Sequence, residues 1–107
     1  MTPTAPTPEL QLPTPALATL WAVLAEVSEV ERAWVFGSRA AGRARPGSDI
    51  DLAVAGIAPL SPAYLRLMHL LDESDLVYHV DIVAYPPAAE ALRRTIDTDG
   101  IEVYRRA

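Results

Sequence analysis

The sequence contains no cysteine, no lysine and no asparagine, and it has few aromatic residues. Without cysteine there can be no disulfide framework and no thiolate metal site, a composition that fits a reducing cytoplasm. All nine basic residues are arginines. Because aromatic residues make up only 7% of the 107 residues, the core must consist mainly of Leu, Val, Ile and Ala.

The sequence also lacks excess positive charge and long apolar runs. Its formal net charge is −5, so direct nucleic-acid binding is not expected. No segment reaches the roughly 20 apolar residues of a membrane span, and the N-terminus has neither the charged nor the apolar region of a signal peptide. We therefore expect a cytoplasmic protein without membrane association.

The length suits one domain of modest size, preceded by a tail. Residues 1–13, MTPTAPTPELQLP, carry four of the ten prolines and almost no apolar periodicity. This composition predicts a flexible, extended Pro/Thr-rich segment. The folded domain is then expected to span residues 14–107.

Apolar periodicity and turn residues divide the domain into alternating helices and strands. Thr14 followed by Pro15 has the pattern of a helix N-cap and first turn, and Ser61-Pro62 repeats it. Helices are predicted at 14–30, 39–44, 61–71 and 86–99, and strands at 32–36, 49–55, 78–85 and 101–104. We expect an α/β (α+β) fold, a small mixed sheet flanked by helices that pack on one face.

Two aspartates interrupt the apolar strand at 49–55. Asp49 and Asp51 are separated by one residue, so both side chains leave the same face of a strand. Carboxylates are among the groups least often buried in proteins. Asp81 lies between Val80 and Ile82 in the next predicted strand. If the two strands pair, Asp81 can stand beside the Asp-x-Asp pair.

Three neighbouring carboxylates require a compensating charge or a proton. At about 4 Å, one ionised pair repels by roughly 4 kcal/mol at an effective dielectric constant of about 20. Either the group becomes protonated or a hard divalent cation lies among the carboxylates. Oxygen ligands alone favour Mg²⁺ or Mn²⁺ over zinc.

Gly37-Ser38 follows the strand at 32–36 and supplies a second element of a site. Glycine lets the backbone approach a ligand closely, and a strand-to-helix turn directs free N–H groups toward an anion. A phosphate site on one side and metal-binding carboxylates on the other predict a nucleoside-triphosphate site. Metal-assisted phosphoryl-type transfer needs these two components more than a protein nucleophile.

The spaced set Gly37-Ser38, ten residues, Asp49-Ile50-Asp51, then Asp81 resembles the DNA polymerase β-like nucleotidyltransferase superfamily. The short chain resembles its smallest branch, the minimal nucleotidyltransferases. The resemblance covers roughly residues 14 to 104, and it rests on the whole set, since Gly-Ser or Asp-x-Asp alone would be a weak signal.

The resemblance implies the polymerase β-like fold and a set of site residues. Asp49, Asp51 and Asp81 would be catalytic and bind two Mg²⁺ ions, while Gly37 and Ser38 would grip the triphosphate of a nucleotide such as ATP. Asp81 would also help to deprotonate the acceptor hydroxyl. A nucleoside monophosphate would be transferred with loss of pyrophosphate.

Four further residues near the motif have less specific interpretations. Arg39, Arg43 and Arg45 predict a solvated basic face, from which Arg39 is the first candidate to reach a phosphate and bind the nucleotide. His79, two residues before Asp81, is a candidate for a position near the site, with a position away from the site as the favoured interpretation.

The resemblance also implies a partner, a helical HEPN-type protein. The chain would act as the antitoxin of a toxin–antitoxin pair by transferring AMP to a protein hydroxyl. Two alternatives remain at this point. The chain could neutralise its partner as a binding module in a stoichiometric complex, or it could modify a small molecule of the aminoglycoside type. A homo-oligomer is also left open.

Overall fold

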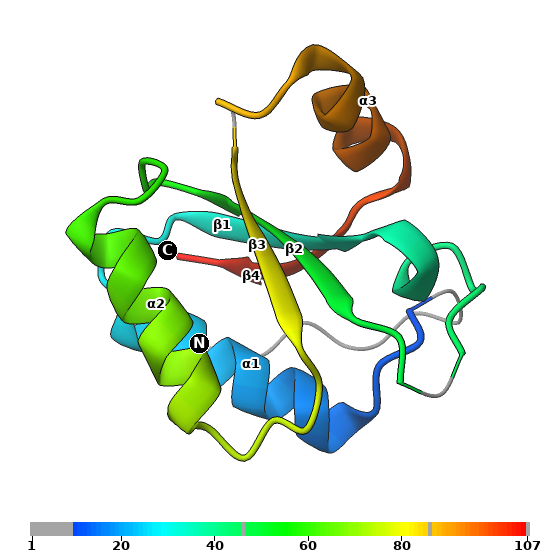
Figure 1. Ribbon diagram of the computed structural model, residues 1–107. Coiled ribbons are helices and arrows are strands. Elements are labelled where there is room, and N and C mark those ends of the chain that lie inside the picture. The colour runs from blue at the N-terminus through cyan, green and yellow to red at the C-terminus, as the bar shows by residue number, and fades with distance from the viewer. Residues whose placement is uncertain (1–9, 46, 86, 107) are drawn as a thin grey trace.

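The computed structural model describes residues 10–45, 47–85 and 87–106 (Figure 1). The helices are α1 (Thr14–Glu26), the 3₁₀ turn η1 (Gly37–Arg39), α2 (Pro62–Glu73) and α3 (Glu90–Asp99), and the strands are β1 (Arg32–Phe36), β2 (Ile50–Ala55), β3 (Val80–Tyr85) and β4 (Ile101–Arg105). Within these residues no helix has the length and apolar character needed to cross a bilayer.

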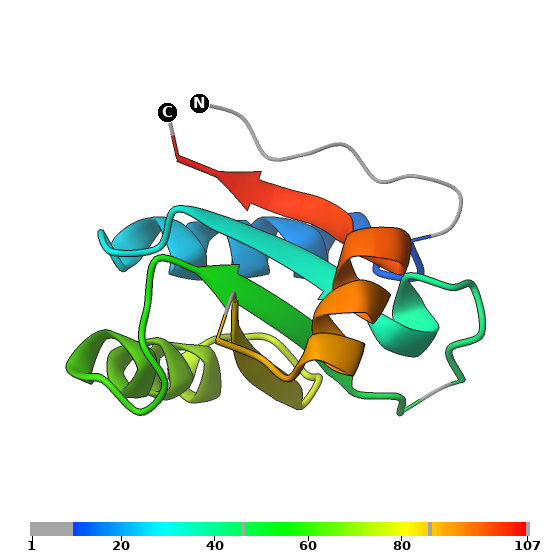
Figure 2. The ribbon, with the colours of Figure 1, turned by 90° about the horizontal axis from the view of Figure 1, so that it is seen from above.

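The four strands form one mixed sheet in the order β3-β2-β1-β4, which Figure 2 shows from yellow to red. β1 pairs antiparallel with both β2 and β4. β2 and β3 are parallel, with α2 as the crossover between them. The mixed sheet predicted from the sequence is confirmed, and β3 and β4 are its two edges.

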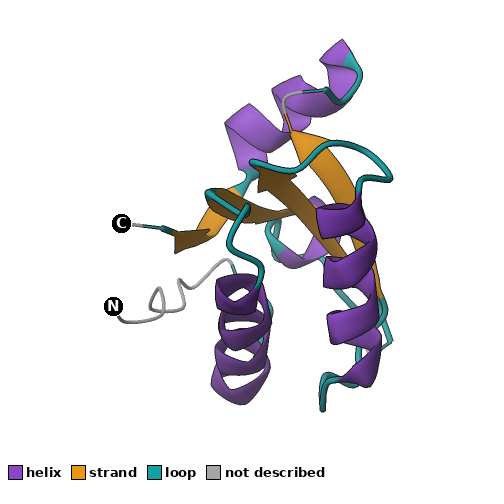
Figure 3. Ribbon diagram, turned by 90° about the vertical axis from the view of Figure 1, so that its left-hand side faces the viewer, coloured by secondary structure: helices purple, strands orange, loops and turns teal. Residues whose placement is uncertain are grey.

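Helices cover both faces of this sheet, so the expectation that they pack on one face was wrong. α1 and α2 cover the main core, into which β2 projects Ile50, Leu52 and Val54. α3 stands apart from that pair (Figure 3) and packs Ile96 against Ala53 of β2 in a second cluster. Strand alternation therefore places the residues at the odd positions of β2 on the α3 face.

Several boundaries differ from the sequence prediction. Pro13 is the N-cap of α1 without a side-chain hydrogen bond, and Thr14 is already helical. The first helix ends at Glu26 instead of residue 30.

The Ser61 cap is confirmed, since its Oγ accepts a hydrogen bond from the Tyr64 N–H at 3.2 Å. The helix expected at 39–44 is reduced to η1, and the last helix begins at Glu90; its expected start at residue 86 lies outside the described residues.

The folded domain begins before residue 14. Leu10 and Leu12 are buried in the main core, and the Gln11 N–H donates to the Arg39 carbonyl oxygen at 2.7 Å. Residues 1–9 of the expected tail lie outside the described residues. Leu-x-Leu after a proline-rich segment is too short to show periodicity, and only long-range packing reveals that it belongs to the core.

The burial of Leu12 predicts a measurable cost for its truncation. Leu12 is 4% exposed, so Leu12→Ala should lower the free energy of unfolding by about 2–4 kcal/mol through lost burial and a residual cavity. Leu65→Ala is the matched control, because Leu65 is 52% exposed on α2 and should change stability by less than about 0.5 kcal/mol. Urea unfolding measures both. Equal stabilities for the two variants would place Leu12 outside the folded domain.

Candidate active site

The structure brings the three predicted carboxylates together through the β2–β3 pairing. Asp51 lies directly opposite Asp81 in the parallel register. Asp49, one residue before β2, lies beside His79, whose carbonyl oxygen accepts a hydrogen bond from the Ile50 N–H at 2.8 Å. The register therefore sets Asp49, Asp51, His79 and Asp81 at four neighbouring positions on the α3 face.

These carboxylates differ in their contact with water. Asp49 and Asp81 are exposed, whereas Asp51 is half-buried. Burial raises the pKa of Asp51 above its ordinary value of 3.8, and the negative charges of Asp81 and Asp49 raise this pKa further. The ionised form of Asp51 is thus disfavoured when no cation is bound nearby, and a cation bound there would favour it.

The Gly37-Ser38 turn lies against the carboxylate cluster. Phe36, the last residue of β1, is opposite Asp51 in the antiparallel register, so the turn begins beside Asp51. Gly37 adopts φ +73°, and a Cβ at this position would collide with the Asp51 carboxylate oxygen Oδ2. Only glycine permits both this backbone conformation and this close approach. Ser38 is half-buried in the same turn.

Arg39 does not share the exposed basic face expected for the three arginines. Arg43 and Arg45 are exposed, but Arg39 is 5% exposed and is the only buried charged residue in the described part of the chain. Its position inside the domain was not visible from sequence, because an arginine between serine and alanine carries no burial signal.

The Arg39 guanidinium connects three segments of the chain. Nε and Nη2 donate to the Ser48 carbonyl oxygen at 3.1 and 2.8 Å, and Nη1 donates to the Gln11 carbonyl oxygen at 2.6 Å. The guanidinium carbon lies 4.4 Å from the centre of the Tyr78 ring. Carbonyl dipoles and the ring offset the cost of burying the cation. Arg39 thereby fixes the backbone that leads into Asp49.

His79 lies next to the carboxylates, a position that the sequence left as the less favoured interpretation. Its Nε2 is 2.9 Å from Oδ1 of Asp81. One ligand atom each from Asp49, His79 and Asp81 lies within 4.8 Å of the other two. The i, i+2 spacing of His79 and Asp81 repeats that of Asp49 and Asp51, and this repetition was the signal available in the sequence.

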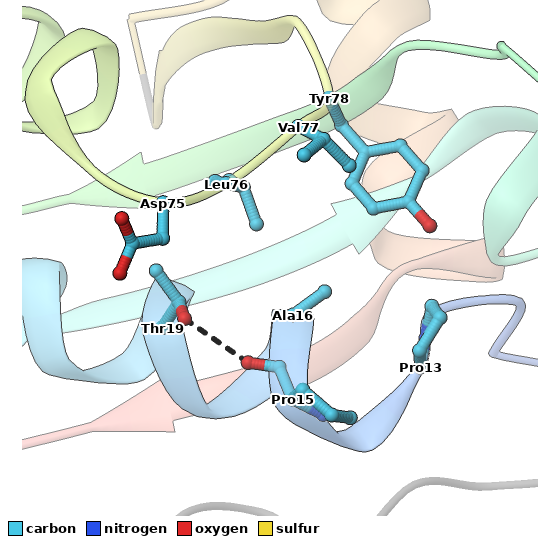
Figure 4. Close-up of a pocket in the computed structure, with 8 residues that line it drawn as sticks. All are labelled: Pro13, Pro15, Ala16, Thr19, Asp75, Leu76, Val77 and Tyr78. Atoms are coloured by element: carbon cyan, nitrogen blue, oxygen red, sulfur yellow. Dashed lines mark hydrogen bonds between the residues drawn. The ribbon is translucent and has the colours of Figure 1, made fainter.

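The donor set fits a divalent cation. Clustered carboxylate oxygens are the ligands that Mg²⁺ and Mn²⁺ prefer, and the negative charges of Asp81 and Asp49 add to burial in raising the pKa of Asp51. By contrast, a hollow of about 420 Å³ lies between the start of α1 and segment 75–78 (Figure 4). No predicted site residue lines this hollow, so it does not locate the site.

A mixed sheet with carboxylates on two neighbouring strands, opposite a glycine–serine turn, defines a nucleotidyltransferase-type domain. The chain belongs to the polymerase β nucleotidyltransferase family, whose model matches residues 19–107. The polymerase β-like fold expected from the motif is therefore confirmed.

Three known proteins illustrate what the chain resembles. The chain is 34% identical over 89 residues to the "Probable protein adenylyltransferase MntA" of Haemophilus influenzae, covering 82% of this chain and 78% of that protein. A toxin–antitoxin crystal structure with AMP-PNP matches at 25% identity and TM-score 0.70, over 84% of this chain and 73% of its own. A structure assigned as a minimal nucleotidyltransferase matches at 36% identity and TM-score 0.63, over 78% and 88%.

The close approach of Gly37 to Asp51 predicts a difference between two glycine variants. Gly37→Ala and Gly42→Ala place an alanine at nearly equal φ, +73° and +72°, but only the Gly37 Cβ meets Asp51, whereas nothing lies within 4 Å at Gly42. Backbone strain of about 1–2 kcal/mol should be common to both. Stabilisation by ATP with Mg²⁺, measured as a thermal shift, should disappear in Gly37→Ala and persist in Gly42→Ala. Equal shifts would separate the turn from the nucleotide site.

The raised pKa of Asp51 predicts a stabilising substitution in the absence of metal. A carboxyl whose folded pKa lies above its unfolded value of 3.8 destabilises the fold at higher pH, and this penalty disappears as pH falls below both values. With chelator present, Asp51→Asn should raise the melting temperature at about pH 7, and the gain should shrink toward about pH 4. Asp72→Asn, on the exposed side of α2, should show no such gain. A pH-independent effect at Asp51 would contradict a raised pKa of this carboxyl in the folded protein.

Proposed function

We propose that the chain is a protein adenylyltransferase that neutralises a helical HEPN-type toxin by transferring AMP from ATP to a hydroxyl side chain. The observation that carries the proposal is the carboxylate cluster of β2 and β3 beside the Gly37 turn. The identity to an MntA protein and the likeness to a toxin–antitoxin structure with AMP-PNP support it.

Each predicted site residue has a role in this proposal. Asp49, Asp51 and Asp81 would hold Mg²⁺, two ions being expected from the family resemblance. Bound there, Mg²⁺ would neutralise triphosphate charge and polarise the phosphorus that is attacked. The Gly37 and Ser38 backbone N–H groups and the Ser38 hydroxyl bind triphosphate oxygens.

Arg39 acts on the site through the backbone in this proposal. Its guanidinium already binds Ser48 and Gln11, so a direct phosphate contact, expected from the sequence, would require these bonds to break. Arg39 instead holds the segment before Asp49 in place. Asp81 accepts the proton of the acceptor hydroxyl at a carboxylate oxygen, which its 54% side-chain exposure on an edge strand makes accessible.

A protein acceptor fits the open site better than a small molecule. The hollow of about 110 Å³ that His79 borders in the described residues lies on the core side of β3, since Met68, Val80 and Ile82 line it, and it is not an acceptor pocket at the carboxylates. Asp49 and Asp81 are exposed on the other face of the sheet. A mobile hydroxyl-bearing segment of another protein can reach these exposed carboxylates.

Co-expression with a HEPN-domain toxin tests the proposal. The toxin should gain the mass of one or more AMP groups on tyrosine, serine or threonine, seen by intact-mass spectrometry. Asp81→Asn should reduce the modification at least about a hundredfold, the contribution of a metal-binding or proton-accepting group. Asp75→Asn, an exposed aspartate in the loop after α2, should leave it unchanged.

Two other outcomes would reject the proposal. An unmodified toxin in a tight, inhibited complex, with ATP and Mg²⁺ supplied, would identify a binding module. Transfer of AMP to an aminoglycoside and to no protein would identify a small-molecule transferase.

A further inference from the structure

The parallel register of β2 and β3 places four residues next to one another on one face of the sheet. The aspartates of the family motif occupy three of these positions. Asp51 faces Asp81, and the pair one step earlier on each strand's site face is Asp49 and His79. All four side chains leave the sheet on the face away from α1 and α2, because Ile50 and Val80 between them point into the main core. The fourth corner of the array is thus an imidazole.

The imidazole nitrogen is directed into the carboxylate cluster. His79 Nε2 lies 2.9 Å from Oδ1 of Asp81, and it lies with Asp49 and Asp81 oxygens in one group of ligand atoms within 4.8 Å of each other. Two ligands bonded at about 2.1 Å to one ion are at most about 4.2 Å apart. The side chains of His79 and Asp81 are 67% and 54% exposed, so small rotations bring these atoms to bonding distance.

We propose that His79 is a direct metal ligand, which completes an Asp49–His79–Asp81 set and gives this site a preference for Mn²⁺ over Mg²⁺. The inference rests on the metal site of the proposed function and specifies the ion that this site selects. The proposal concerns His79, which is not one of the aspartates of the motif.

The chemistry of the donor atoms sets the direction of the preference. Mg²⁺ is a hard ion that takes oxygen ligands and keeps several waters. Imidazole nitrogen binds first-row transition metals better, and carboxylates accept Mn²⁺ as readily as Mg²⁺. Adding one nitrogen to a carboxylate cluster therefore strengthens Mn²⁺ binding more than Mg²⁺ binding.

A different role for His79 would be to orient Asp81 by a hydrogen bond, without contact with the ion. Such outer partners also affect metal affinity, so affinity alone does not separate the two roles. His79→Gln does, because glutamine can still donate an N–H to Asp81 but has no imidazole nitrogen. His69→Ala is the matched control, since His69 is the only other histidine and lies on α2, where it contacts Glu73.

The experiment titrates the full chain, alone, with MnCl₂ and follows free Mn²⁺ by electron paramagnetic resonance, with MgCl₂ as competitor. His79→Ala and His79→Gln should each weaken Mn²⁺ binding by about ten- to a hundredfold and change Mg²⁺ binding by less than about threefold. His69→Ala should bind both ions like the unmodified chain. Pulsed measurements should detect nitrogen coupling to bound Mn²⁺ in the unmodified chain and in His69→Ala, and lose it in both His79 variants.

Four results would overturn the inference. Absence of nitrogen coupling in the unmodified chain, or unchanged Mn²⁺ affinity in His79→Gln, would make His79 an outer partner of Asp81. Equal loss of affinity for both ions would remove the selectivity. If the unmodified chain bound neither ion, the metal site of the proposed function would be wrong as well. If only the role of His79 were wrong, the unmodified chain would still bind both ions and Asp81→Asn would abolish that binding.

Discussion

The parallel pairing of β2 with β3 is the constraint on which the site depends. It requires a crossover, which α2 provides by packing Leu67 and Leu71 into the main core and by donating the Tyr64 hydroxyl to the Ile82 carbonyl oxygen at 3.1 Å. A slip of one residue would turn the face of β3 that carries Asp81 into the core. The burial of one face therefore fixes the positions of the charges on the other.

The same pairing brings like charges together, which costs stability in the protein without metal. Burial and, after it, the charges of Asp81 and Asp49 raise the pKa of Asp51, and the core beneath β2 offsets the cost of keeping this carboxyl ionised. A cation or a nucleotide–metal complex that binds only the folded state reverses the balance by mass action. Gly37 allows the turn after β1 to share this space, since a side chain there would displace Asp51. Stability and ligand binding are thus coupled at one carboxylate.

Sequence reasoning succeeded where a local pattern determines the structure. The bounds of β1 and the Ser61 cap follow from short-range signals, and the proximity of Asp81 to Asp51 follows from strand pairing. It failed where distant residues decide. Arg39 is buried by contacts with Gln11 and Tyr78, which no periodicity encodes. The unbroken apolar run of β1 was the available signal for the second cluster, beneath α3, since strands covered on both faces are apolar throughout.

The incomplete cover of the second face explains how a small domain can act on a large acceptor. α3 is anchored at the far end of the sheet, where Tyr85 packs on Trp34 with ring centres 5.1 Å apart and donates its hydroxyl to Asp97 at 2.8 Å. Asp81 lies at the opposite end of β3, on an edge strand, with its side chain in water. The helix therefore stabilises one half of the face and leaves the half with the carboxylates uncovered in the described residues. Because Asp49 and Asp81 are exposed there, a segment of a partner protein can approach them from solvent.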